Sequence, residues 1–262
     1  MKIIYIIIII LIILSEINRN QGTIHLNPYE YYTSGRFILA PYSVLCDMFT
    51  NGGTKPFPDM NIHFKNHYKL KDNYDIIREE ALNIYNTGAA TKIKNDMFFD
   101  GIADNGWKKF YIKWYGDITP ESYQLCPKTV ELIKELPEVK LAMFSILEPG
   151  SIIKPHTGPF KGCVRYHLGL DVPEKDAFIM IDGNMYQWKN GEDILFDDTY
   201  YHEVKNLSDK NRIILFIDVE KKMSNKITQS INSMFINILG PISTRANDLQ
   251  EKKPVWKNKY RE

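Results

Sequence analysis

Between residues 139 and 220 the apolar positions come in short runs with turn residues between them. Pro149-Gly150, Asp182-Gly183 and Asn190-Gly191 separate neighbouring runs and favour tight turns. The runs are "VKLAMFSIL", "SIIKP", "CVRYHLGLDV", "AFIMID", "MYQWK", "DILFDD", "YHEVKN" and "RIILFIDVE". Seven or eight closely spaced strands without helices between them predict a sandwich or a barrel, and a cupin-like jelly roll, the double-stranded β-helix, is the natural candidate.

Helical spacing appears on both sides of these strands. The stretches "NYDIIREEALNIYN" (residues 73–86) and "CPKTVELIKEL" (residues 126–136) repeat apolar positions every three or four residues. After the strands, one stripe is expected to pack a C-terminal helix against the barrel until Gly240-Pro241 ends it. Its members are Met223, Ile227, Ile231, Met234, Phe235, Ile238 and Leu239. The predicted fold is therefore mainly β, with flanking helices N-terminal and C-terminal to the barrel.

The N-terminus carries twelve consecutive apolar residues, Ile3 to Leu14, directly after Lys2. A transmembrane helix needs roughly 20 apolar residues and the core of a signal peptide about 7 to 15. Residues 1–20 are therefore interpreted as a signal peptide or a short uncleaved signal-anchor. Lys2 favours a cytosolic N-terminus. This predicts a single-pass membrane protein with a lumenal or external catalytic domain, or a secreted protein if the segment is cleaved. "NLS" at Asn206 offers one glycosylation acceptor.

The pattern divides the rest of the 262 residues into three segments. Residues 21–69 lack a sustained period and predict an irregular linker or arm. Residues 70–222 hold the barrel and its helices, and residues 223–262 the C-terminal helix and a solvated tail. A net charge of +1 gives no global field that would attract nucleic acid. Cys46, Cys126 and Cys163 form no CxxC signature and are compatible with one disulfide or with three thiols.

The strand "CVRYHLGL" places unusual chemistry on one face. Because residues two apart share a face, Cys163, Arg165, His167 and Gly169 lie on one side of it. Val164, Tyr166, Leu168 and Leu170 lie on the other side. Arg beside His is costly to bury unless an anion binds there. A solvent-facing strand explains this run equally well.

Two further histidines and an arginine favour the first explanation. His156 is followed, after a long gap, by His202, and Arg212 comes ten residues later. This order resembles that of 2-oxoglutarate-dependent iron oxygenases, in which two strands offer imidazoles to Fe(II) and a deeper arginine holds the far carboxylate of the cosubstrate. Imidazole suits Fe(II), and a guanidinium grips a carboxylate through two parallel hydrogen bonds.

A longer set of motifs is similar to one family. Roughly residues 70 to 220 resemble the catalytic domain of aspartyl/asparaginyl β-hydroxylases. The matching stretches are "NGWKKF", "PKT", "FSILEPGSIIKPHTGP", "CVRYHLGL", "WKNGEDILFDDTYYHEV" and "RIILFIDV". The resemblance implies an Fe(II)/2-oxoglutarate-dependent dioxygenase that uses O2 to hydroxylate an unactivated carbon while 2-oxoglutarate is decarboxylated to succinate. The first expected target is the β-carbon of peptidyl Asp or Asn.

The same resemblance assigns roles to individual residues. His156 and His202 are expected to bind iron, while Gly158 stands where related oxygenases place a carboxylate ligand. Asp198 is the expected catalytic carboxylate that orients a water in the missing ligand position. The positions expected to contact 2-oxoglutarate are Trp107, Ser145, Arg165, Tyr166, His167 and Arg212.

Two departures keep other substrates and functions in view. Residues 21–69 show no pattern of the helical repeats that precede the barrel in the animal enzymes, and Cys126 stands alone where those enzymes have a pair of cysteines. A lipid acyl chain is therefore the second expected substrate, since other members of the family hydroxylate such chains. A catalytically inactive, cupin-like binding module is the third alternative. The intact His156, His202 and Arg212 argue against it.

Overall fold

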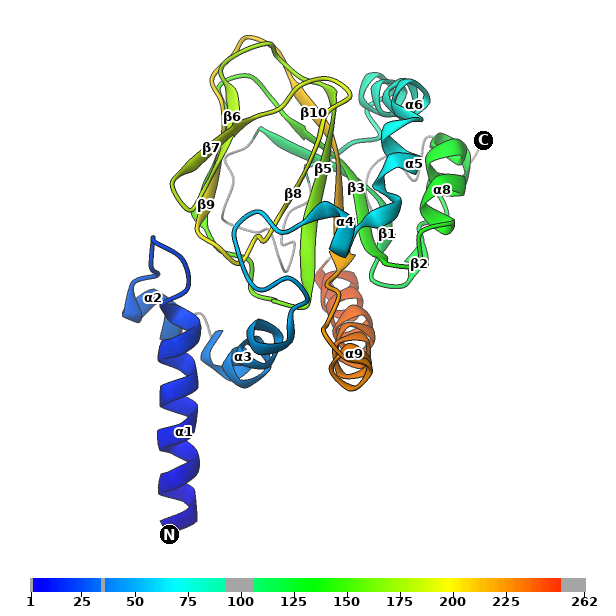
Figure 1. Cartoon of the computed structure of the whole chain (residues 1–262). Helices are drawn as coiled ribbons and strands as arrows, with labels where there is room; N and C mark the ends of the chain where they lie inside the picture. Colours follow the sequence, from blue (N-terminus) through cyan, green and yellow to red (C-terminus); the bar gives the residue numbers. More distant parts are fainter. Residues whose placement is uncertain (1, 34–35, 93–105, 251–262) are drawn as a thin grey trace.

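The computed structural model describes residues 2–33, 36–92 and 106–250, with side chains from residue 3 to residue 238. Two antiparallel sheets face each other (Figure 1). The six-stranded sheet has the order β2 (Asp117–Ile118), β1 (Trp107–Trp114), β3 (Val139–Leu147), β10 (Arg212–Glu220), β5 (Cys163–Asp171), β8 (Asp193–Phe196). The four-stranded sheet has the order β4 (Ile152–His156), β9 (His202–Asn206), β6 (Ala177–Ile181), β7 (Asn184–Gln187). The predicted double-stranded β-helix is confirmed, with every predicted strand in place.

Strand β1 was not predicted. Its sequence "WKKFYIKW" interrupts the apolar positions with lysines, so that no clean alternation appears. In the structure Lys109 is buried and its Nζ lies 4.1 Å from the centre of the Trp107 ring. A lysine that covers an aromatic ring can occupy an inward position. Sequence periodicity does not reveal such a contact.

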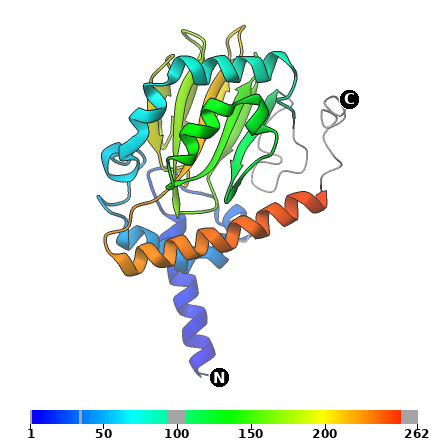
Figure 2. The same cartoon turned by 90° about the vertical axis from the view of Figure 1, so that its right-hand side faces the viewer.

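Helices cover the outer face of the six-stranded sheet. Helix α6 (Tyr74–Asn86) and helix α8 (Pro127–Lys134) lie across it in Figure 2, as the helical spacing predicted. The apolar face of β5, with Val164, Leu168 and Leu170, packs in this layer. A second apolar layer fills the space between the two sheets and includes Ile153, Ile179 and Phe216. The candidate site lies in the same space, because Ile153, Ile179 and Phe216 also line its cavity.

The expectation of an irregular segment over residues 21–69 is wrong. It contains α2 (Pro28–Thr33), η1 (Arg36–Leu39), α3 (Ala40–Phe49), α4 (Met60–His63), η2 (Lys65–His67) and α5 (Tyr68–Lys71). Another short helix, α7 (Ser122–Leu125), precedes α8. Apart from α3, each has only one or two turns, which is too short for a repeating apolar pattern. Packing against the barrel therefore determines them, as most helical stability in proteins comes from tertiary contacts.

The C-terminal helix α9 (Lys226–Gln250) continues through Gly240-Pro241, so the predicted end of this helix is wrong. Its buried positions also differ from the predicted stripe: Thr228, Asn232 and Ile236 are buried, whereas Ile227 and Met234 are exposed. The reason is a polar contact. The Asn232 amide donates to the carbonyl of residue 162 at 3.0 Å and thereby rotates a polar residue toward the barrel. The predicted tail beyond residue 250 lies outside the described residues.

Helix α1 (Lys2–Arg19) contains the N-terminal apolar run. Among the described residues, no helix is long and apolar enough to cross a membrane. Asn206 is fully buried, and its amide donates to the Leu147 carbonyl at 2.8 Å. The folded protein therefore does not offer Asn206 for glycosylation. The three cysteines are buried and form no disulfide.

Candidate metal and cosubstrate site

Two histidines meet on neighbouring strands of the smaller sheet. His156, the last residue of β4, is the direct cross-strand partner of His202, the first residue of β9. Their ring centres lie 4.2 Å apart. Directly opposed side chains on antiparallel strands are close neighbours on one face of the sheet. The register of these two strands therefore brings together the two residues that the sequence predicted as metal ligands.

Hydrogen bonds set the tautomer of both rings. Nδ1 of His156 lies 2.6 Å from the Lys154 carbonyl, and Nδ1 of His202 lies 2.8 Å from the Tyr200 carbonyl. Because a carbonyl only accepts, each Nδ1 must carry the proton, and each Nε2 keeps its lone pair. Burial lowers the pKa of His156 to about 4 and the pKa of His202 well below its ordinary value. Both rings are thus neutral at pH 7, the form that binds a metal ion.

In the part of the chain that the structure describes, no third protein ligand joins them. Within the described ranges, no group of three or more His, Cys, Asp or Glu side chains could hold a metal ion. Gly158 follows His156 by two positions, and a Cβ added there would lie 2.1 Å from Oδ2 of Asp198. The Gly158 N–H also donates to the Asp198 carbonyl at 2.7 Å. The Asp198 carboxylate therefore occupies the space that a carboxylate side chain at position 158 would need.

Arg165 forms ion pairs with Asp198 and with Asp218 of β10. Its Nη1 lies 2.9 Å from Asp198 Oδ2 and its Nε 3.0 Å from Asp218 Oδ1. Burial opposes the charge of Arg165, but the two carboxylates outweigh it and raise the pKa of this guanidinium. Burial raises the pKa of Asp198 to about 7, although Arg165 opposes the change. Arg165, predicted to contact the cosubstrate, is engaged by two protein carboxylates in this structure.

Arg212 is in the opposite situation. It is 1% exposed, and none of the ion pairs among the described residues involves it. Its Nε has no hydrogen-bond partner, and its guanidinium carbon lies 4.9 Å from the centre of the Trp188 ring. Burial lowers the pKa of Arg212 to about 9. A buried cation without an anion is costly, so the site lacks a negatively charged partner.

His167 shares this deficit. Neither of its ring nitrogens has a hydrogen-bond partner among the described residues, and the ring is buried. Burial, followed by the charges of Arg212 and Arg165, lowers its pKa well below the ordinary value. A neutral imidazole always keeps one N–H donor and one acceptor. His167 and Arg212 therefore both present unsatisfied donors to whatever fills the site.

One cavity brings these residues together. Its volume is about 350 Å³, including its open mouth. The predicted residues that line it are Trp107, Ser145, His156, Arg165, His167, His202 and Arg212, and the other lining residues are Ile153, Ile179, Phe196, Val204 and Phe216. The Trp107 indole N–H donates to Ser145 Oγ at 2.9 Å, which fixes both side chains. Seven of the predicted positions thus converge on one space between the sheets.

Tyr166 does not line this cavity, and its predicted contact with the cosubstrate is corrected. Its ring packs edge-on against Phe64 in the helical layer, and its hydroxyl donates to Asp193 Oδ2 at 3.1 Å. Strand alternation explains the error, because Tyr166 lies between Arg165 and His167 and must point to the other face. The resemblance had suggested a role that the alternation of β5 excludes.

Trp188, Phe196 and Phe216 are site residues that the sequence analysis did not single out. Trp188 lies against Arg212, and its own indole N–H is a buried donor without a partner. The centre of the Phe216 ring lies 4.3 Å from the Arg165 guanidinium carbon, and the Phe196 ring packs edge-on against His167. Alternation along β10 and β8 could have placed the phenylalanines on the inner face. Trp188 lies just beyond the last residue of β7, where strand alternation ends.

A second cavity of about 510 Å³ shares His156 and Arg165 with the first. Its remaining walls are Tyr115, Leu141, Thr157, Gly158, Pro159, Phe160, Cys163, Asp198 and Asp218. Phe160 stacks on Tyr42 of α3, with ring centres 5.4 Å apart. This cavity therefore approaches the histidine pair from the side of α3 and α9, through a partly apolar space.

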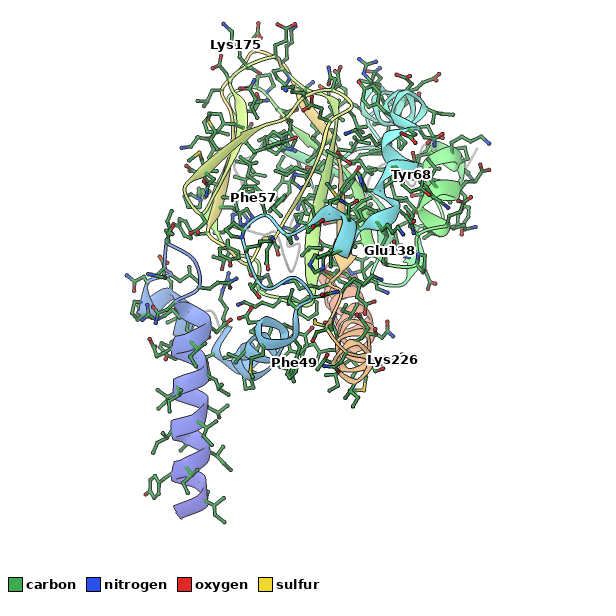
Figure 3. All side chains as sticks on the ribbon, in the orientation of Figure 1. Phe49, Phe57, Tyr68, Glu138, Lys175 and Lys226 are labelled. Carbon is green, nitrogen blue, oxygen red and sulfur yellow. The ribbon has the colours of Figure 1, made fainter. Side chains whose placement is uncertain are left out.

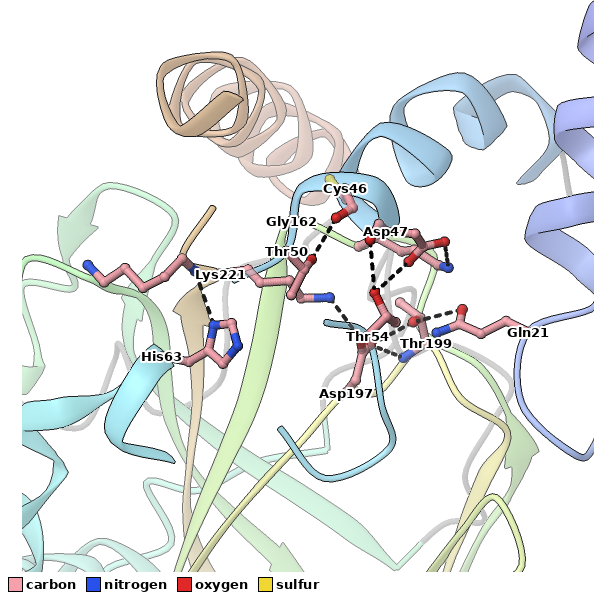
Figure 4. Close-up of polar contacts among 12 residues, drawn as sticks. Gln21, Cys46, Asp47, Thr50, Thr54, His63, Gly162, Asp197, Thr199 and Lys221 are labelled. Carbon is pink, nitrogen blue, oxygen red and sulfur yellow. Dashed lines mark hydrogen bonds and ion pairs between the residues drawn. The ribbon is translucent and has the colours of Figure 1, made fainter. Parts of the chain in front are cut away.

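A buried ion pair supports the turn before β9. Lys221 Nζ lies 2.7 Å from Asp197 Oδ2, and both side chains are almost fully buried. Thr199 donates its hydroxyl to Asp197 Oδ1 at 2.6 Å (Figure 4). His63 Nδ1 accepts the N–H of Lys222 at 3.1 Å in the same region. These bonds hold the backbone that carries Asp198 and His202.

Fold and geometry define a jelly-roll protein in which a pair of neighbouring histidines and a buried arginine line one cavity between the sheets. Residues 71–222 match the family described as Aspartyl/Asparaginyl beta-hydroxylase. The chain belongs to this family.

Named relatives differ in what they hydroxylate. The chain is 38% identical over 124 residues to an ornithine lipid ester-linked acyl 2-hydroxylase of Rhizobium tropici, covering 47% of this chain and 44% of the relative. It is 29% identical over 156 residues to the human aspartyl/asparaginyl beta-hydroxylase, covering 57% and 20%. Among solved structures, a Pseudomonas putida prolyl-4-hydroxylase has 14% identity and a TM-score of 0.42, covering 58% and 87%. The matched part of this chain spans less than half the length of the Rhizobium tropici relative and of the human relative.

Proposed function

We propose that the protein is an Fe(II)/2-oxoglutarate-dependent dioxygenase that hydroxylates an unactivated carbon of a lipid acyl chain. The observation that carries the proposal is the unpaired, buried guanidinium of Arg212 in the cavity that also holds His156 and His202. A dicarboxylate with one end at a metal ion and the other at a guanidinium needs both features in one space. The residues present fit this pair of ligands.

His156 and His202 would hold the metal through Nε2, because their Nδ1 atoms donate to backbone carbonyls. With these two ligands from the described residues, several coordination positions remain for small molecules. When bound, Fe(II) together with O2 and 2-oxoglutarate supplies the oxidising power for hydroxylation. The chain itself supplies binding, orientation and exclusion of water.

Arg212 would bind the far carboxylate of 2-oxoglutarate through two parallel hydrogen bonds. Ser145 is oriented by the Trp107 indole and lines the same space. His167 offers an N–H to the cosubstrate while remaining neutral, because burial lowers its pKa. Phe196 and Phe216 form apolar walls that keep water from these charge-assisted bonds and so strengthen them.

Because Gly158 has no side chain, the Asp198 carboxylate occupies the space beside it. From there Asp198 would orient a water in the coordination position that a carboxylate ligand fills in related oxygenases. The carboxylate is anchored by Arg165 Nη1 at 2.9 Å. Its pKa of about 7 allows the carboxyl to hold or release a proton near neutral pH. These properties support the catalytic role expected from the sequence.

Two observations favour an acyl chain as the substrate. The second cavity reaches the histidine pair, and Leu141, Pro159 and Phe160 give it an apolar wall that suits a methylene chain. The Rhizobium tropici relative, whose name states an acyl 2-hydroxylase, has higher identity than the human enzyme. Peptidyl Asp or Asn, the first expectation from the sequence, is the second candidate because the human relative also matches over 57% of the chain.

One assay tests the two candidate substrates side by side. The purified protein is loaded anaerobically with Fe(II) and 2-oxoglutarate and then given O2 with either lipid extract or a peptide library. We expect succinate release and addition of one oxygen atom to a lipid acyl chain. Hydroxylated peptides instead would select the second candidate. No product with either substrate, and no Fe(II) binding, would support the inactive binding module.

Matched variants link the result to the site. His156→Ala and His202→Ala are each expected to lose metal binding and activity. His25→Ala is the control, because this histidine belongs to neither cavity. A wild-type metal affinity in both site variants would contradict the proposal.

A further inference from the structure

Helix α1 is apolar on every side. Residues 3–13 are isoleucine or leucine apart from Tyr5, and each side chain is between 39% and 73% exposed. In Figure 1 and in the perpendicular view of Figure 2, this part of α1 extends away from the barrel. A helix that is apolar all round needs an apolar environment on all sides. A protein partner with one groove would cover only part of this circumference.

The end of the barrel from which α1 extends carries more exposed apolar residues. Helices α3 and α9 lie at this end, and both views place α9 across the direction of α1. On α9, Ile227 is 74% and Met234 58% exposed, and Ile238 is exposed one turn further along the same stripe. Ile38 of η1 and Met48 of α3 are exposed as well. Together with residues 3–13 of α1, these five residues define the docking end.

Amphipathic groups surround the base of α1. Tyr32 donates its hydroxyl to Glu16 Oε1 at 2.7 Å, and Arg19 pairs with the same carboxylate at 2.6 Å. Tyr29, in the same short helix α2, is strongly exposed. Tyrosine is enriched where a lipid bilayer meets water, because its ring is apolar and its hydroxyl is polar. The sequence of layers along α1 is thus apolar helix, then aromatic and charged groups, then barrel.

We propose that the docking end binds a lipid bilayer, with residues 3–13 of α1 immersed in one leaflet and the stripe of α9 lying at its surface. Eleven helical residues extend about 17 Å, close to half of the roughly 30 Å hydrocarbon core. The bilayer covers all sides of α1 at once. Neither the immersed part of α1 nor the stripe of α9 crosses the membrane in this arrangement. The proposal holds whether the substrate is a lipid or a peptide.

The docking end is connected to the site. Arg36 of η1 donates to the carbonyls of Thr157 at 2.7 Å and Gly158 at 3.2 Å. Phe160 in the following turn stacks with Phe235 of α9, with ring centres 6.0 Å apart. The turn beside the histidine pair is therefore held by elements of the docking end. Membrane binding would bring the second cavity close to the lipid surface.

The full chain is tested by flotation with neutral phosphatidylcholine vesicles at low and at 1 M NaCl. We expect the wild type to float at both salt concentrations, because the attraction is apolar and salt screens only charges. Ile227→Glu and Met234→Glu are each expected to weaken partition by about tenfold or more, since each removes an apolar side chain from the lipid. Met185→Glu is the matched control, because Met185 is 65% exposed on β7, away from the docking end.

Brominated lipids supply a second measurement with conservative variants. Met48→Trp should show fluorescence quenching by brominated acyl chains, whereas Met185→Trp should not. Wild-type protein that stays with the soluble fraction, flotation that disappears at 1 M NaCl, or equal losses in Met234→Glu and Met185→Glu would each overturn the proposal. A stable dimer without vesicle binding, dissociated by Ile227→Glu, would show that a second copy covers this end. Activity on detergent-dispersed substrate tests the proposed function separately.

Discussion

Replacing Arg212 by methionine separates the stability of the barrel from binding of the cosubstrate. Arg212 is 1% exposed, has no ion pair among the described residues and lies against Trp188. Methionine is flexible, apolar and similar in length, so it can fill the same space against the indole ring. The substitution removes a buried charge and leaves no buried carboxylate without its partner.

The magnitude follows from the pKa of the guanidinium. Burial lowers it from the ordinary value of an arginine to about 9, which means that the folded state disfavours the charged form. At about 1.4 kcal/mol per pKa unit, the shift corresponds to about 5 kcal/mol as an upper bound. Because buried sites relax, and replacement of buried ionic groups by apolar ones typically gains about 1–4 kcal/mol, we expect Arg212→Met to be about 1–3 kcal/mol more stable without ligands.

Urea unfolding of the metal-free protein measures this gain. The same measurement with Mn(II) and 2-oxoglutarate measures the loss of binding, since a ligand stabilises the state that it binds. The cosubstrate should stabilise the wild type and leave Arg212→Met nearly unchanged. Arg212→Lys is the control for charge: it keeps the cation but not the two-pronged geometry, so 2-oxoglutarate should bind more weakly while metal affinity stays near normal.

Two outcomes would refute this reasoning. If Arg212→Met unfolds at a lower urea concentration than the wild type, the guanidinium stabilises the ligand-free fold and is not an unpaired buried charge. If 2-oxoglutarate stabilises Arg212→Met as much as the wild type, the cosubstrate binds elsewhere.

Three further outcomes are expected. Gly158→Ala should lower the free energy of unfolding by about 1–3 kcal/mol, because its Cβ would meet the Asp198 carboxylate, and Asp198→Ala in the same chain should relieve part of that cost in a double-mutant cycle. Burial, and then the charge of Lys221, lowers the pKa of His63 to about 4, below its ordinary 6.5, so the unfolded state binds more protons between these values. The stability that His63 contributes above pH 6.5 is therefore lost as the pH falls, by about 2 kcal/mol between pH 7 and pH 5, and His63→Asn should flatten this part of the pH profile. Tyr166→Phe should cost about 1 kcal/mol in urea unfolding and leave 2-oxoglutarate binding unchanged; weaker cosubstrate binding would return Tyr166 to the site.

Figure 3 draws the described side chains on the helices and strands that carry them. Local periodicity predicted the eight strands from residue 139 to residue 220, because alternation and turn residues are short-range properties. It failed for β1, whose lysines interrupt the alternation, and for the short helices between residues 28 and 71. On α9 it selected Ile227 for the buried face, whereas the structure buries Asn232 through its hydrogen bond to residue 162.

The same division holds for the site. The sequence alone predicted which residues belong to one site, since His156, His202 and Arg212 follow in an order that resembles that of 2-oxoglutarate-dependent iron oxygenases. Only the tertiary structure decided their neighbours. The register of β4 and β9 makes the two histidines cross-strand partners, and the packing of Asp198 over Gly158 couples residues forty positions apart. The alternation of β5, combined with the face on which the helices pack, removed Tyr166 from the cavity. Such contacts depend on which strands pair and which face is covered, and these are long-range properties that no local pattern contains.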